Sequence, residues 1–137
     1  MIRKLTLFAL VALLLTGCKY QDGPLLSLRS KEKRVVNTWS FDVVTNADGT
    51  DATANFAGWT VALHESGSLF IHWKFLGADH DDTGSWEFAD RKESIHLTYG
   101  NTTLQTMFPK QFLITKLKNK NMIIKSNANV IYNLTSD

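Results

Sequence analysis

The stretch WTVALHESGSLFIHWKF, residues 59–75, decides the fold class of this 137-residue chain. Apolar residues recur at every second position over residues 59–63 and again over residues 69–75. An alternation of period two predicts strands with one buried face each. ESGS at residues 65–68 predicts a tight connection, because Gly67 can adopt the positive φ of a hairpin turn. The stretch therefore predicts two neighbouring antiparallel strands.

The same alternation recurs in the chain on both sides of this hairpin and predicts six further strands. Their expected inward-facing residues are Val35, Trp39, Phe41 and Val43; Trp86 and Phe88; Ile95, Leu97 and Tyr99; Phe112, Ile114 and Leu117; Met122 and Ile124; and Val130, Tyr132 and Leu134. Leu117 is out of phase with its own strand, so a β-bulge is expected near Thr115 or Lys116.

Eight short strands at even spacing favour an antiparallel up-and-down eight-stranded β-barrel. Closure also removes the exposed strand edges that an open sheet must protect. A two-sheet β-sandwich is the alternative. Residues 46–51, 77–84 and 100–110 are expected to form loops, and no segment of the domain shows the sustained period that predicts a helix.

The N-terminus has the pattern of an export signal. Arg3 and Lys4 precede an apolar run over residues 5–15, which is too short for a membrane-spanning helix of about 20 residues. LTGC at residues 15–18 then resembles the lipobox of bacterial lipoproteins. That resemblance implies cleavage before Cys18 and a lipid, such as palmitate, on this residue.

Loss of residues 1–17 changes the charge of the chain. The whole sequence holds 15 basic and 13 acidic residues, and removal of Arg3 and Lys4 leaves 13 of each. No broad positive field remains, so no nucleic-acid partner is expected. Cys18 is the only cysteine, and its lipidation leaves no thiol for a disulfide, a metal site or a nucleophile.

The expected product is a lipid-anchored protein of the bacterial cell envelope, with the membrane as a partner through Cys18. Residues 18–33 are predicted to form a tether, and residues 34–137 the barrel domain. Lys19 stands where an inner-membrane retention signal has aspartate, which favours the outer membrane. The tether lacks a run of acidic residues, which favours the periplasmic face.

Three motifs carry a family resemblance. They are VNTW at residues 36–39, TGSWEF at residues 83–88 and FLITKL at residues 112–117. In this order, after a lipobox, they resemble the lipocalin-like lipoproteins of Bacteroidota over nearly the whole chain. Asn37 stands where lipocalins have glycine before the first tryptophan, and Asn tolerates unusual backbone angles. The resemblance implies a β-barrel and an apolar ligand.

One group of ionisable side chains stands out as a candidate for chemistry. It comprises Asp79, His80, Asp81 and Asp82. With His64 and His72 it could bind a divalent cation, but it lacks the Asp-x-Asp-x-Asp-Gly order of a calcium loop. A solvated acidic loop is therefore favoured over a metal site. His64, His72 and His96 are expected to face solvent.

The sequence contains no Gly-x-Ser-x-Gly, no phosphate-binding loop and no paired-carboxylate motif with a definable partner. We therefore expect neither an enzyme nor a cofactor.

Four tryptophans are expected inside the barrel. They are Trp39, Trp59, Trp73 and Trp86. An eight-stranded barrel is either filled by side chains or holds one small ligand, and both readings stay open. The first hypothesis is a binding or carrier module for a small apolar ligand, with some of these tryptophans lining the barrel mouth. The alternative is a non-enzymatic envelope interaction module with a filled barrel, which binds a protein or a glycan through loops 46–55 and 77–84.

Overall fold

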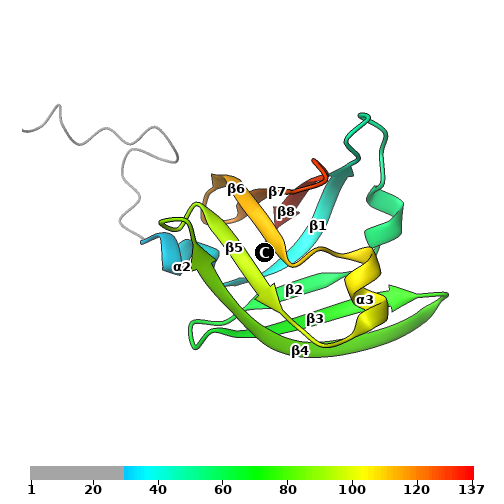
Figure 1. Cartoon of the computed structure of the whole chain (residues 1–137), viewed down its shortest axis with the longest axis horizontal. Helices are drawn as coiled ribbons and strands as arrows, with labels where there is room; N and C mark the ends of the chain where they lie inside the picture. The colour runs from blue at the N-terminus through cyan, green and yellow to red at the C-terminus, as the bar shows by residue number, and fades with distance from the viewer. Residues whose placement is uncertain (1–29) are drawn as a thin grey trace, which may run out of the picture.

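The computed structural model describes residues 30–137, and in this part of the chain eight strands form a closed antiparallel barrel (Figure 1). The strands follow chain order around the barrel, and β8 closes it by pairing with β1. Their bounds are β1 (Asn37–Thr45), β2 (Thr60–Leu63), β3 (Ser68–Phe75), β4 (Ala78–Ala89), β5 (Ser94–Thr98), β6 (Gln111–Leu117), β7 (Asn121–Ser126) and β8 (Ile131–Thr135). The predicted eight-stranded barrel is confirmed.

The predicted hairpin of β2 and β3 is present. Val61 lies opposite Ile71, and both are buried. The connection closes through a hydrogen bond of 3.0 Å from the Gly67 N–H to the His64 carbonyl. Gly67 has a φ of +89°, a conformation that glycine adopts without a steric penalty.

The inward phase expected for the first strand is wrong beyond Phe41. A register shift between Phe41 and Val43 marks a β-bulge against β8. The extra residue turns every later side chain to the other face of the sheet. Val44 is therefore fully buried, whereas Val43 is 44% exposed.

A second bulge lies on β6 where the sequence predicted it. The register between β6 and β7 shifts between Ile114 and Lys116. The shift returns Leu117 to the interior, where it is buried. In this strand the local pattern alone was enough to locate the irregularity.

The loop expected over residues 77–84 is a strand. β4 pairs with β3 without a break, from Ser68 opposite Ser85 to Phe75 opposite Ala78. The chain reverses at Leu76 and Gly77, which both have positive φ. The first residues of β4, next to the hairpin tip, have both faces in solvent. Charged side chains are compatible with pairing there, so a polar sequence does not exclude a strand.

Short helices occupy three segments in which the sequence predicted none. They are α2 (Lys31–Val35), η1 (Thr53–Phe56) and α3 (Thr102–Met107). The α-helices have side-chain caps: Ser30 accepts a hydrogen bond from the N–H of Lys33, and Asn101 accepts one from the N–H of Leu104. Helices of four to six residues are too short to show a helical period.

α2 covers one end of the barrel, and it begins inside the segment predicted to be a tether. The indole Nε1 of Trp39 donates a hydrogen bond of 2.9 Å to the Val35 carbonyl. Arg34 Nη1 donates one of 2.9 Å to the Leu117 carbonyl at the end of β6. Val35, expected in the first strand, is instead the buried last residue of this helix.

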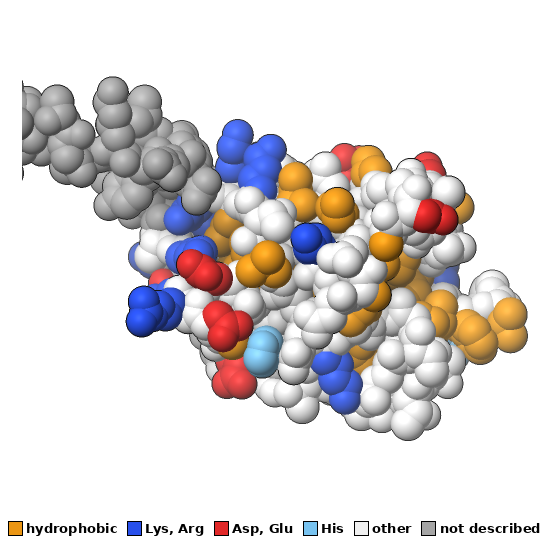
Figure 2. All heavy atoms as spheres, turned by 45° about the horizontal axis from the view of Figure 1, so that its top comes forward, with side chains coloured by type: hydrophobic (Ala, Val, Ile, Leu, Met, Phe, Trp, Pro, Cys, Tyr) orange, Lys and Arg blue, Asp and Glu red, His pale blue; other side chains and the backbone are white. Residues whose placement is uncertain are grey.

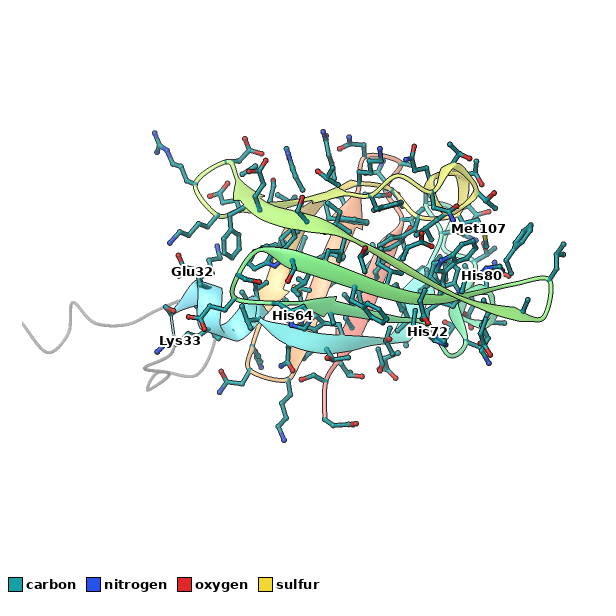
Figure 3. The ribbon with its side chains drawn as sticks, turned by 90° about the horizontal axis from the view of Figure 1, so that it is seen from below. Glu32, Lys33, His64, His72, His80 and Met107 are labelled. Atoms are coloured by element: carbon teal, nitrogen blue, oxygen red, sulfur yellow. The ribbon has the colours of Figure 1, made fainter. Side chains whose placement is uncertain are left out.

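The two ends of the barrel are built differently. α2 lies at one end with the β2–β3 and β4–β5 turns, and η1, α3 and the tip of the β3–β4 hairpin lie at the other (Figure 1). Figure 3 shows the same separation, with Glu32 and Lys33 at one end and His80 and Met107 at the other. Within residues 30–137, no helix is both long enough and apolar enough to cross a membrane.

Candidate functional site

The end of the barrel that carries η1 and α3 has a cavity of about 450 Å³, which we call the mouth pocket. It is open to solvent and is lined by Asn46, Ala52, Asn55, Phe56, Lys74, Phe75, Leu76, Met107, Val130 and Tyr132. Figure 2 shows hydrophobic side chains gathered toward the protruding tip at the right of the view, where the β3–β4 hairpin lies. A volume of this size is in the range of small-molecule sites.

Phe56 and Tyr132 line the pocket on its barrel side, and other rings pack against them. The Phe56 ring stacks on Phe41 with centroids 5.0 Å apart. It also meets Tyr132 edge-on at 5.6 Å and Trp59 at 4.9 Å. Such offset and edge-to-face contacts between aromatic rings are favourable. The mouth pocket therefore lies above a packed aromatic layer and does not open into it.

The rim of the pocket is apolar and partly in solvent. Leu76, at the tip of the β3–β4 hairpin, is 90% exposed, and Phe75 is 37% exposed. Met107 at the end of α3 and Val130 before β8 line the same pocket. Large exposed apolar side chains grouped around a cavity are typical of a binding surface.

Lys74 supplies a positive charge at the edge of the pocket. Its side chain is 50% exposed, and its Nζ lies 3.8 Å from Oδ1 of Asp79. Its methylene stem lies beside Gly58: a Cβ at that position would come within 2.9 Å of the Lys74 Cε. The absence of a side chain at Gly58 therefore makes room for the lysine.

The four tryptophans of the predicted site do not meet at one place. Trp59 and Trp73 are adjacent, with ring centroids 5.9 Å apart, and they lie next to the pocket residues Phe56 and Phe75. Trp39 packs at the opposite end, against the carbonyl of Val35 in α2. Trp86 is half-buried and donates a hydrogen bond of 2.8 Å to the His64 carbonyl. Whether any of them contacts a ligand stays a prediction.

The acidic group lies on paired strands and not in a loop. His72 on β3 lies between two carboxylates of β4: its Nδ1 is 2.6 Å from Asp81 Oδ1, and its Nε2 is 3.4 Å from Asp79 Oδ1. His80 stacks on Trp73, with ring centroids 4.6 Å apart. Within the described part of the chain, no three His, Cys, Asp or Glu side chains are arranged so that they could hold a metal ion.

Two tyrosines near the pocket are shielded from water. Burial raises the pKa of Tyr132 from 10.0 to about 12. Burial, with a smaller contribution from Tyr132, also raises the pKa of Tyr99. The hydroxyl of Tyr99 donates a hydrogen bond to the Phe108 carbonyl, which connects the residue after β5 to the residue after α3. Both rings remain neutral at physiological pH.

Most of the pocket residues were not candidates in the sequence. Leu76 falls between a predicted strand and a predicted loop, Met107 lies in a predicted loop, and Phe56 lies between predicted elements. A large apolar residue beside a turn glycine, as in Leu76-Gly77, was the available signal, because such positions usually favour polar residues. Cys18, the predicted lipidation site, lies outside the described residues.

Comparison with solved structures identifies the architecture. The chain is similar to a lipocalin-like protein from Bacteroides uniformis ATCC 8492 (TM-score 0.62, 12% identity, covering 76% of this chain and 99% of that one). It is also similar to an uncharacterized protein from Bacteroides eggerthii DSM 20697 (TM-score 0.61, 13% identity, 75% and 99% coverage). A DUF4847 family protein from Bacteroides vulgatus ATCC 8482 gives a TM-score of 0.57 at 8% identity, with 78% and 96% coverage.

No protein-family model and no curated protein matches the sequence. The identities to the solved structures are low, so the similarity concerns the path of the backbone and not individual site residues. The sequence-based resemblance is confirmed at that level: the chain has the lipocalin-like barrel fold of these Bacteroides proteins.

Proposed function

We propose that this protein is a binding module that holds a small apolar ligand in the mouth pocket. The observation that carries the proposal is the exposure of Leu76, which is 90% accessible on the rim of a cavity of about 450 Å³. An exposed leucine at a hairpin tip contributes nothing to the core, and its apolar surface is covered only when something binds there.

The packed interior supports binding at the mouth and not deep inside the barrel. Phe108 is buried between the edge-on rings of Phe41 and Tyr132, at centroid distances of 5.7 and 5.5 Å. Opening a cavity there would separate close-packed rings, which is costly because core packing is dense. The mouth pocket needs no such rearrangement.

The lipid anchor is part of the same proposal. The lipobox-like LTGC motif at residues 15–18 supports attachment of Cys18 to an envelope membrane, with the outer membrane favoured. α2 begins within the predicted tether and lies at the end of the barrel opposite the mouth pocket (Figure 1). An anchor at this end would leave the pocket, at the other end of the barrel, accessible from the surrounding envelope compartment. A protein or glycan partner stays the alternative, with residues 46–55 as the contacting loop.

A binding titration with N-phenyl-1-naphthylamine, a neutral apolar dye, tests the proposal. Trp59 and Trp73 adjoin the pocket residues Phe56 and Phe75, so their emission reports on occupancy. We expect saturable binding of one dye per chain, weakened about tenfold by Leu76→Asp, because a charge on the rim disfavours an apolar ligand.

The matched control is Leu113→Asp. Leu113 is 44% exposed on β6 and is not among the pocket residues. This variant should bind the dye as the unmodified protein does. Absence of saturable binding, or an equal loss in both variants, would refute the mouth pocket as the ligand site.

A further inference from the structure

We infer that the ligand of the mouth pocket is an apolar molecule with one negatively charged end group, and that Lys74 receives that charge. The inference rests on the proposed function of the pocket and specifies the chemical class of its ligand. Three observations support it: Lys74 lies at the edge of the pocket, Gly58 leaves room for its side chain, and its acidic neighbour Asp79 also contacts His72.

Lys74 alone carries a formal charge among the described residues that line the pocket. The other polar lining residues, Asn46 and Asn55, are neutral amides, and the remaining lining is aliphatic or aromatic. A single cation at the edge of an apolar surface matches a ligand with one anionic group at the end of an apolar body. The anion is attracted to the cation, and the apolar body packs against the apolar lining.

The lysine stem is held beside the backbone that follows η1. A Cβ on Gly58 would lie 2.9 Å from Cε and 3.2 Å from Nζ of Lys74, so the side chain occupies the space that any larger residue would fill. Gly58 also has a φ of +77°, which strains any residue with a side chain. The ammonium thus lies near η1, whose last residue, Phe56, also lines the pocket.

The ammonium retains hydrogen-bonding capacity. Its distance of 3.8 Å to Asp79 Oδ1 is an ion-pair contact but exceeds hydrogen-bond length. The same Asp79 oxygen lies closer, at 3.4 Å, to Nε2 of His72. An ammonium has three N–H donors, so Lys74 can bind an incoming anion without losing a short hydrogen bond.

The half-exposed position of Lys74 suits an end group that stays partly hydrated. Neither the ammonium nor the anion needs full desolvation, which would otherwise offset much of their attraction. The apolar body can then pack against Phe75 and Met107 while the charged end faces solvent. The charge contributes selectivity, and burial of the apolar body contributes most of the affinity.

The test compares decanoate with 1-decanol, which share a chain length and differ in the charge of the end group. Binding to the purified protein is followed by tryptophan emission at neutral pH. We expect decanoate to bind about fivefold more tightly, as for a partly exposed charge pair. Lys74→Met should abolish this preference, whereas Lys74→Arg should retain it. The control, Lys116→Met on β6, removes an exposed lysine that is not among the pocket residues.

A second variant tests the competition from the acidic neighbour. Asp79→Asn removes the carboxylate near Lys74 and should strengthen decanoate binding without changing that of decanol. Salt should weaken the preference for decanoate, because it screens exposed charges. If both probes bind equally to the unmodified protein, or if Lys74→Met keeps the preference, the inference fails and the pocket still stands. If neither probe binds, the proposed function itself fails.

Discussion

The indole Nε1 of Trp73 donates a hydrogen bond of 2.6 Å to Oδ2 of Asp82, joining the buried face of β3 to the adjacent β4. Asn101, the N-cap of α3, donates to the same carboxylate oxygen at 3.4 Å. One carboxylate in the segment expected to be a solvated loop thus connects a core tryptophan to the helix beside the mouth pocket. Trp59 differs, because its equally buried Nε1 has no acceptor among the described residues.

Replacing each tryptophan by phenylalanine separates the hydrogen bond from the packing. Both changes remove a similar ring volume at buried sites, since Trp73 is 2% exposed and Trp59 is 1% exposed. Trp73→Phe also leaves the Asp82 carboxylate without its short donor, so it should lower the free energy of unfolding by about 1–3 kcal/mol more than Trp59→Phe does. Urea titrations measure both values. Equal losses would show that the bond to Asp82 contributes nothing net.

The bulge on β1 is tested by the same substitution on its two sides. Val44→Ala removes methyl groups from a fully buried site and should cost about 2 kcal/mol in the free energy of unfolding. Val43→Ala acts on a residue that is 44% exposed and should change stability by less than about 0.5 kcal/mol. A reversed order, measured by denaturant unfolding, would mean that β1 follows the uninterrupted alternation.

Leu76 should strengthen ligand binding in the mouth pocket and lower the free energy of unfolding of the protein. Leu76 and Gly77 have φ values of 51° and 78°, and turns with two positive φ values favour Asn-Gly. Leu76→Asn should therefore raise the free energy of unfolding by about 1 kcal/mol and weaken dye binding. Leu76→Ala is the matched control, which should weaken binding without raising stability. An unchanged melting temperature in Leu76→Asn would contradict the turn argument.

Gly84, within the TGSWEF motif, allows β4 to approach the end of β5. A Cβ at Gly84 would lie 1.9 Å from the Thr98 carbonyl oxygen, so a side chain there forces the backbones apart. We expect Gly84→Ala to cost about 2 kcal/mol or more, or to prevent folding. Gly100→Ala provides the control, since a Cβ at Gly100 meets nothing within 4 Å. Thermal unfolding followed by circular dichroism distinguishes the two variants.

Alkaline conditions should destabilise the barrel through its buried tyrosines. The pKa of Tyr132 rises from 10.0 to about 12 on burial, so the unfolded chain ionises first. The corresponding stability is fully present below pH 10 and is lost as the pH rises toward 12, on the order of 2–3 kcal/mol for this residue. Tyr132→Phe should flatten the loss. Tyrosinate absorbance and denaturant unfolding, both recorded as a function of pH, test this prediction. If the free energy of unfolding falls with pH as steeply in Tyr132→Phe as in the unmodified protein, the prediction is wrong.

Local patterns predicted most of the barrel. The period-two runs that contain Trp59 and Trp73 determine two strands and their shared hairpin, because side chains alternate between the faces of any strand. The bulge beside Lys116 was also visible, since Leu117 breaks the phase of its own strand. The bulge near Val43 was not, because Val43 and Val44 are both apolar and either phase satisfies the pattern.

The candidate site was less predictable than the fold. Phe75 was assigned to the interior, yet β3 extends past the end of the barrel, and the side chain lies on the rim of the pocket. Leu104 and Met107 belong to a helix of six residues, too short for a period to appear. Phe56 gains its role only because η1 brings it over the end of the barrel.

By itself the sequence predicted most of the strands and the tight turns, and it favoured a closed antiparallel barrel over a sandwich, because these features depend on alternation and on glycine at local positions. The tertiary structure alone decided where the mouth pocket lies. Phe56, Leu76, Met107 and Tyr132 come from four separate parts of the chain, and barrel closure brings them around one cavity. Their meeting depends on strand register and on a filled interior, which are properties of the whole barrel and not of any segment.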